Sequence, residues 1–306
     1  MNNRFTMLRL PSALRCRFIA ASGILKQLEY IMTSRNQNVK YWQLQSGRID
    51  FDDCPVFMGI VNATPDSFSD GGKYFAASDA IRRGLELAEL GAKIIDVGGE
   101  STRPDSEPVA VDEELRRVVS VIKGIRKLNL KIPISIDTNK SVVAKEAVNA
   151  GANIINDVFA AEDDGMIQLL LDTQTAICIM HHQGSPKTMQ NNPTYKNVLA
   201  DVHHYLTQQR TKLINAGVNP KRIAIDPGLG FGKTAEHNWE LVENIEYFQD
   251  IDSPLLVGHS RKRFLKTKFA DPEEGTKTVT LQLIQKGVNI IRIHEIHNEY
   301  TPHIKK

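Results

Sequence analysis

Cysteine is scarce in this sequence, and the few cysteines present do not form a recognisable site. Cys16, Cys54 and Cys178 lie far apart along the chain. Their number is odd and their spacing matches no set of zinc ligands, which excludes a disulfide framework and a cysteine-bound metal. Sparse, unpaired cysteine is typical of a reducing compartment, so we expect a cytoplasmic protein.

Long apolar runs and an excess of one charge are also lacking. No hydrophobic stretch approaches the roughly 18 residues that a membrane-spanning helix requires. The 38 basic and 36 acidic residues leave a net charge of only +2, which gives no indication of a nucleic-acid-binding surface. We therefore expect small-molecule substrates, with neither a nucleic acid nor a membrane as partner.

Acidic residues are missing from the first 28 positions, which contain Arg4, Arg9, Arg15, Arg17 and Lys26. This pattern resembles an organelle transit peptide or a weak secretory signal. The interpretation that we favour places the natural start at Met32, with the preceding residues a floppy or non-native extension. We therefore treat residues 1–36 as an N-terminal extension and residues 37–306 as one domain.

From position 56 onward, short apolar segments rich in Val and Ile alternate with amphipathic helical patterns. The predicted strands are 56–61, 93–97, 132–136, 153–155, 175–180, 222–225, 255–257 and 289–293. Nearly continuous apolar character is typical of parallel strands buried on both faces. Eight such strands without a linker predict a (βα)8 TIM barrel. A doubly wound open sheet is the alternative, and its dinucleotide-binding form is disfavoured because the first strand is not followed by a Gly-x-Gly-x-x-Gly turn.

Two segments fall outside the repeat. Residues 40–55 include Tyr41, Trp42 and Phe51 and are predicted to form a small β-hairpin that plugs the bottom of the barrel. After Ile296 only ten residues remain, so the last outer helix is expected to be short or missing.

Polar residues follow all eight predicted strands, at the end of a barrel where βα loops carry the chemistry. They are Asn62, Asp96, Asp137, Asn156, His181, Asp226, His259 and Arg292, with their neighbours. Each has an ordinary explanation on its own, since Asp137 and Asp226 could cap helices and a lone histidine is more often a core residue. Their recurrence at every strand end indicates one polar site.

The residue types in this set indicate a chemistry. The carboxylates of Asp137 and Asp226, with the Asn156 amide, suit a heterocycle rich in N–H and carbonyl groups, such as a pterin. Lys262, Arg292 and His294 suit an anion such as pyrophosphate, with neutral donors from the Thr102 loop. Asn62 is an oxygen ligand suited to Mg²⁺ bridged to phosphate oxygens. No activated Ser or Cys nucleophile is evident, so displacement of pyrophosphate is the predicted reaction class.

The same segments resemble the dihydropteroate synthase family, from about Tyr41 to Ile296. The motifs that carry the resemblance are 58–72 (MGIVNATPDSFSDGG), 96–104 (DVGGESTRP), 135–138 (SIDT), 155–157 (IND), 226–233 (DPGLGFGK), 258–262 (GHSRK) and 292–294 (RIH). The resemblance implies a homodimeric transferase of folate biosynthesis and a sulfonamide target. It would join 6-hydroxymethyl-7,8-dihydropterin pyrophosphate to p-aminobenzoate and release pyrophosphate.

The resemblance also implies a role for each matched residue. Asp137, Asn156, Asp226 and Lys262 would hold the pterin, and Asp137, Lys262 and Arg292 would be the catalytic set. Arg292, His294, Thr102 and Asn62 would bind pyrophosphate, with Mg²⁺ at Asn62. The p-aminobenzoate pocket and its surroundings would include Phe68, Arg103, Pro104, Phe231, Ser260 and Lys262. The loops after the first two strands would close over the site.

The sequence departs from the family pattern in a few places. Asp105 stands where Gly is usual, and His182 where Met is usual. The short tail leaves the dimer in doubt, because the family's last helix contributes to dimer packing. Two rival functions remain open at this point: a pterin-dependent methyltransferase domain, and an inactive synthase-like paralogue that serves as a binding protein.

Overall fold

The computed structural model describes residues 39–51, 55–63, 73–101, 106–128, 131–184, 188–297 and 299–300. In the helix at residues 73–89, side chains are described from residue 77 onward. The predicted N-terminal extension, residues 1–36, lies outside the described residues. Within the described part, no helix is both long and apolar enough to cross a membrane.

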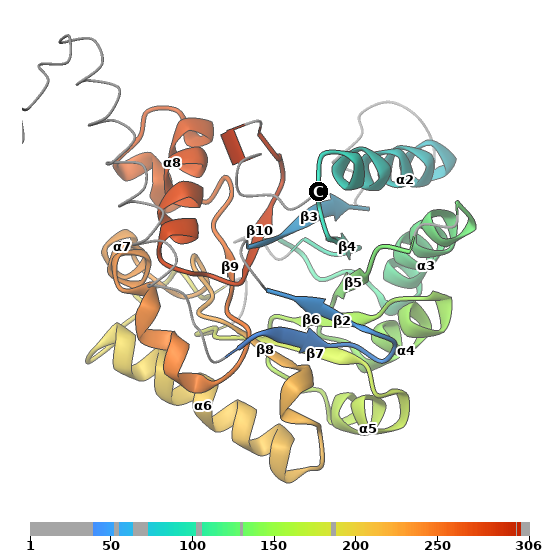
Figure 1. The fold of residues 1–306 in the computed structure, drawn as a ribbon, viewed down its shortest axis with the longest axis horizontal. Coiled ribbons are helices and arrows are strands. Elements are labelled where there is room, and N and C mark those ends of the chain that lie inside the picture. The colour runs from blue at the N-terminus through green and yellow to red at the C-terminus, as the bar shows by residue number, and fades with distance from the viewer. Residues whose placement is uncertain are drawn as a thin grey trace, which may run out of the picture.

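Eight parallel strands form the centre of the molecule and are surrounded by helices (Figure 1). The strands are β3 (Val56–Asn62), β4 (Ile94–Gly98), β5 (Ile134–Asp137), β6 (Ile154–Asp157), β7 (Ala176–Met180), β8 (Ile223–Asp226), β9 (Leu256–Gly258) and β10 (Ile290–Ile293). Their order is β8-β7-β6-β5-β4-β3-β10-β9, and a parallel bridge between Ile225 and Leu255 brings the two edges together. The predicted barrel is confirmed, and the open sheet is excluded.

The outer layer consists of the segments between the strands. The α-helices are α2 (Lys73–Glu89), α3 (Val111–Lys127), α4 (Ser141–Ala150), α5 (Asp164–Thr173), α6 (Val198–Asn215), α7 (Ala235–Glu243) and α8 (Pro272–Gln285). Short 3-10 helices are η2 (Pro220–Arg222), η3 (Ile245–Ile251) and η4 (Arg263–Thr267). No α-helix follows β10 among the described residues, in which 299–300 belong to a 3-10 turn; the rest of the tail, where a short or missing last helix is predicted, lies outside them.

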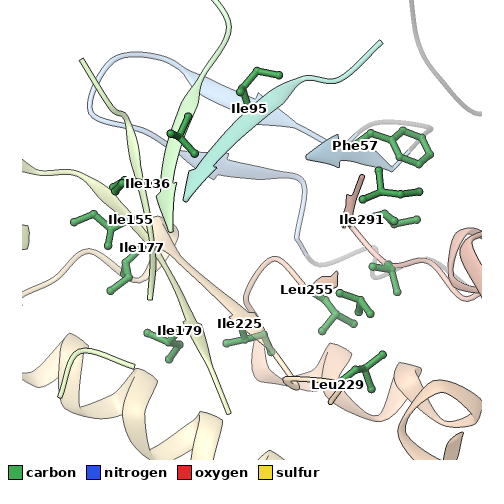
Figure 2. Packing of buried hydrophobic residues seen from close by; sticks show 14 of the residues in the cluster. Phe57, Ile95, Ile136, Ile155, Ile177, Ile179, Ile225, Leu229, Leu255 and Ile291 are labelled. Carbon is green, nitrogen blue, oxygen red and sulfur yellow. The ribbon is translucent and has the colours of Figure 1, made fainter. Parts of the chain in front are cut away.

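The strands bury apolar side chains on both faces, which explains their continuous hydrophobic character. Outward-facing residues pack against the helices in one large cluster, and Figure 2 shows part of it, including Phe57, Ile136 and Ile291. Alternate residues point into the barrel and form a second cluster that includes Met58 and Ile154. The period of two along each strand therefore separates an outer core from an inner core.

A small antiparallel hairpin covers the bottom of the inner core. It consists of β1 (Tyr41–Gln43) and β2 (Arg48–Asp50) and lies across the end of the barrel in Figure 1. The Trp42 side chain is fully buried in the inner cluster, and its indole nitrogen donates to the Arg222 carbonyl oxygen at 2.9 Å. The predicted plug is confirmed.

Candidate active site

The interior of the barrel changes from apolar to polar toward the carboxyl ends of the strands. On β6, Ile154 belongs to the apolar inner core, whereas Asn156, two residues later, is polar and buried. On β10, Ile290 is followed in the same way by Arg292. Because side chains on one face of a strand recur every second residue, the polar side chains share one level inside the barrel. This level is the floor of the candidate site.

Arg292 joins the carboxylates on this floor. Its Nε atom donates to Asp96 Oδ2 at 2.6 Å, and its Nη2 atom donates to Asp137 Oδ2 at 2.5 Å. Asn156 also donates to Asp96 Oδ2, at 3.3 Å. Burial opposes the charge on Arg292, but attraction to Asp96 and Asp137 outweighs it and raises the pKa of the guanidinium. Arg292 therefore stays cationic.

Among the residues that the structure describes, one carboxylate oxygen of Asp137 has no partner. Its Oδ1 atom is buried and makes no hydrogen bond within the described part of the chain, although Oδ2 is paired with Arg292. Burial raises the pKa of Asp137 to about 7, against the opposing effect of Arg292. A buried, unpaired acceptor is costly, so Oδ1 is suited to a ligand that supplies an N–H donor.

Asp226 and Lys262 face the same floor from the other side of the barrel. Asp226 is buried and accepts a hydrogen bond from the Gly228 amide at 2.8 Å. Burial raises its pKa, while the nearby Lys262 acts to lower it. Desolvation lowers the pKa of Lys262 to about 8. Lys262 donates to the Leu229 carbonyl oxygen, and its Nζ atom lies 4.6 Å from the centre of the Phe231 ring.

The rim of the site contains Ser260 and His294. Ser260 is buried, and its Oγ atom lies 3.0 Å from His294 Nδ1. Asn62 is the half-buried last residue of β3 and is paired in register with Gly98 of β4. The structure thus brings Asn62, Asp137, Asn156, Asp226, Phe231, Ser260, Lys262, Arg292 and His294 to the same end of the barrel. The predicted site residues Phe68, Thr102, Arg103 and Pro104 lie outside the described residues, as does Asp105.

Asp96 was predicted at a strand end but not among the site residues. Asp96 is fully buried and contacts both Arg292 and Asn156. The sequence feature that indicates it is the period of two on β4, which places Asp96 on the same face as Ile94 of the inner core. An acidic residue on an otherwise apolar inward face requires a partner.

Other chemistries find little support in the described part of the chain. It contains no group of three or more His, Cys, Asp or Glu side chains that could hold a metal ion. Cys178 lies buried in the inner core, where desolvation raises the pKa of its thiol. A buried neutral thiol is a poor nucleophile, so the site is equipped for binding and charge stabilisation.

Comparison with known proteins agrees with this geometry. The model of the pterin binding enzyme family matches residues 58–294. A dihydropteroate synthase from Haemophilus influenzae is 40% identical over 246 residues, which cover 79% of this chain and 89% of the relative.

Solved structures show the same likeness. The Xanthomonas albilineans dihydropteroate synthase with 4-aminobenzoic acid has a TM-score of 0.77 at 38% identity, covering 84% of this chain and 93% of that one. The Yersinia pestis dihydropteroate synthase in a sulfonamide drug complex has a TM-score of 0.79 at 33% identity, covering 86% and 96%. With its barrel, its polar floor and these relatives, the chain belongs to the dihydropteroate synthase family of pterin-binding enzymes.

Proposed function

We propose that this enzyme condenses 6-hydroxymethyl-7,8-dihydropterin pyrophosphate with p-aminobenzoate, forming dihydropteroate and releasing pyrophosphate in folate biosynthesis. The observation that carries the proposal is the Asp137 Oδ1 atom, which has no partner among the described residues and is buried on a floor that also contains Asn156, Asp226 and Arg292. Carboxylate and amide acceptors complement the N–H groups of a pterin ring. The sequence similarity to synthases supports the same substrate pair.

The reaction that fits these residues is a displacement at the pterin methylene carbon. The bond between that carbon and the pyrophosphate oxygen breaks, and its electron pair leaves with pyrophosphate. The arylamine nitrogen of p-aminobenzoate then forms the new bond and loses a proton. Asp137, as a carboxylate, stabilises positive charge that develops on the pterin, because a fixed charge in a desolvated site needs little reorganisation.

Arg292, beside the carboxylates, and His294 at the rim would hold the leaving group. Arg292 is permanently charged and presents a planar set of donors suited to phosphate oxygens. His294 lies at the rim beside Ser260. A methyltransferase that binds a pterin without a pyrophosphate would have no need of these anion-binding groups, so their presence favours the synthase.

Asn62 is the residue proposed to hold Mg²⁺. It supplies one neutral oxygen from a half-buried position at the end of β3. Mg²⁺ usually takes few protein ligands and completes its shell with water and phosphate oxygens. When bound, the ion would neutralise charge on the pyrophosphate. Omission of Mg²⁺ is expected to lower turnover, and a titration with the ion should restore it.

Phe231, Ser260 and Lys262 are proposed to line the p-aminobenzoate pocket. Phe231 offers an aromatic face, and Lys262 offers a cation for the benzoate carboxylate. The Yersinia pestis relative forms a complex with a sulfonamide drug, and we propose the same sensitivity here. Competition of a sulfonamide with p-aminobenzoate in steady-state kinetics tests this, and noncompetitive inhibition would contradict it.

The proposal also includes a cytoplasmic location and a homodimer. Multi-angle light scattering on the purified full chain measures the mass directly, and the sequence gives 34.3 kDa for one chain. A dimer is expected to give about twice this value.

The decisive test is pyrophosphate release that depends on p-aminobenzoate. Purified protein, Mg²⁺ and the pterin pyrophosphate are mixed with and without p-aminobenzoate, and dihydropteroate is measured by chromatography. We expect stoichiometric dihydropteroate and pyrophosphate only in the complete mixture. Binding of the pterin without any product would favour the inactive paralogue instead.

A further inference from the structure

Lys233 is a buried lysine that the proposed reaction does not use. It lies near the end of the segment that connects β8 to α7, and only 2% of its surface is exposed. Burying a lysine is unfavourable unless its amine is fully hydrogen-bonded. The hydrogen-bond partners of this amine therefore indicate what it holds in place.

The amine of Lys233 lies beneath the loop that carries Phe231. Its Nζ atom donates to the Gly228 carbonyl oxygen at 2.9 Å and to the Phe231 carbonyl oxygen at 3.0 Å. The same atom lies 2.8 Å from His181 Nδ1. Burial and the neighbouring Lys233 lower the pKa of His181 to about 2, so this imidazole is neutral and accepts the hydrogen bond.

The other carbonyl oxygens of the loop also have defined partners. Gln190 donates to Gly230 O at 2.7 Å, and the Tyr195 hydroxyl donates to Gly232 O at 2.6 Å. The remaining one, Leu229 O, accepts from Lys262. Of the five carbonyl oxygens from residue 228 to residue 232, four therefore accept from side chains outside the site, and one, Leu229 O, accepts from the active-site Lys262.

The loop also packs closely on the segment that follows β7. A Cβ atom added at Gly228 would lie 1.9 Å from the His181 carbonyl oxygen, and the backbone there has a φ of +69°. Only glycine tolerates this approach and this left-handed conformation. The loop is therefore fixed from below by Lys233 and from the side by the β7 segment.

We propose that Lys233 is a positioning residue, which sets the Leu229 carbonyl and the Phe231 ring against Lys262. The inference rests on the proposed function for the role of Lys262 but not for the geometry. Lys262 interacts electrostatically with Asp226, Asp137 and Arg292 on the floor of the site, and Lys233 interacts with Asp226 and Lys262. Loss of the Lys233 contacts would let the loop move and admit water to the Lys262 amine.

The first test measures how the reactivity of the Lys262 amine depends on pH in the absence of substrate. Competitive acetylation with mass spectrometry gives the pH midpoint of Lys262 reactivity, which is expected at about 8 in the unmodified protein. In Lys233→Met, greater solvation should move this midpoint upward, toward the 10.5 of a free lysine. Lys268 lies at the surface with 49% of its side chain exposed, so Lys268→Met is the matched control. It should leave the Lys262 midpoint unchanged.

A second variant tests the inference independently, in case Lys233→Met does not fold. Tyr195→Phe removes one hydroxyl and frees Gly232 O, so it should fold and shift the Lys262 midpoint in the same direction by a smaller amount. An unchanged midpoint in the folded Lys233→Met protein overturns the inference. If Lys233→Met does not fold, an unchanged Lys262 midpoint in Tyr195→Phe overturns the inference instead.

The second readout is a split in kinetic constants. Lys233→Met should raise the KM for p-aminobenzoate by tenfold or more and the KM for the pterin substrate by less than threefold, because Phe231 moves while Asp137 and Asn156 do not. Equal increases in both constants would indicate a general structural role and contradict the inference. A wild-type enzyme without condensation activity would refute the proposed function, while the acetylation result would still decide the role of Lys233.

Discussion

Arg292 on β10 and Asp137 on β5 are 155 residues apart in the sequence, and their side chains meet at 2.5 Å inside the barrel. This pairing places a permanent cation beside the carboxylate that is proposed to stabilise the pterin. Within the described residues only one oxygen of Asp137 is paired, so the other is suited to a ligand. Under the proposed function, the carboxylate would face the pterin and the guanidinium would face its leaving group.

The buried charge on Asp137 should reduce the stability of the free enzyme at neutral pH. The pKa of Asp137 rises from 3.8 to about 7 on folding, so the folded state holds this proton more tightly. The resulting stability is fully present below about pH 4 and is lost as the pH rises to about 7. Asp137→Asn should therefore become more stable relative to wild type as the pH increases, by roughly 2 to 3 kcal/mol between about pH 5 and pH 8.

Urea unfolding at several pH values measures this difference. Asp250→Asn, an aspartate with 71% of its side chain exposed, is the control and should show a difference of less than about 0.5 kcal/mol at every pH. A difference between wild type and Asp137→Asn that does not depend on pH would show that the carboxylate is already charged in the acid range.

Asp96→Asn should have the opposite effect on stability. It keeps the shape of the side chain but removes a charge that lies 2.6 Å from Arg292 Nε. Leaving a guanidinium partly uncompensated in a buried site is expected to cost about 2 to 4 kcal/mol of unfolding free energy. Asp50→Asn disrupts the exposed pair with Arg48 and should cost less than about 1 kcal/mol. Equal losses in chemical denaturation would contradict the buried network.

The pH dependence of kcat/KM should be bell-shaped. Asp137 must be a carboxylate, which places the acid limb near its pKa of about 7. Lys262 must be an ammonium, which places the alkaline limb near its pKa of about 8. Initial rates over a buffer series test this, and any activity that Lys262→Arg retains should lack the alkaline limb. An alkaline limb that persists unchanged in Lys262→Arg would exclude Lys262 as its source.

The hairpin end of the barrel should contribute to stability and not to catalysis. Trp42 is fully buried among the inner-core residues, so Trp42→Ala is expected to cost about 3 to 5 kcal/mol. Tyr41→Ala, on the half-buried neighbour in the same strand, should cost less than half of this. Both variants should keep wild-type KM values at a temperature where they are folded. A selective change in KM would mean that the hairpin acts on the site.

The sequence was sufficient to predict most of the fold. The eight strands lie within two residues of their predicted bounds because buried parallel strands give short, almost continuous Val and Ile runs. The hairpin was predictable from the large apolar residues around Trp42 that precede the repeat. The closure of the sheet was inferred only from the strand count, and the bridge between Ile225 and Leu255 established it.

The site was predictable as a set of residue types and less so as a set of contacts. Asp137, Asn156, Asp226 and Arg292 follow or end strands, and barrel topology gathers such residues. The roles of Asp96 and Lys233 depend on which side chain each one meets. Arg292 and Asp96 are 196 residues apart, and His181 and Lys233 are 52 apart, so no local pattern indicates either contact.

The central claim is that Asp137 recognises the pterin and Arg292 its pyrophosphate, on one floor. Calorimetric titration of wild type, Asp137→Asn and Arg292→Ala with a dihydropterin lacking phosphate, and then with its pyrophosphate ester, tests this most directly. We expect Asp137→Asn to lose both ligands by at least tenfold, and Arg292→Ala to lose mainly the ester. Equal losses of the two ligands in Arg292→Ala, or unchanged pterin affinity in Asp137→Asn, would contradict the account.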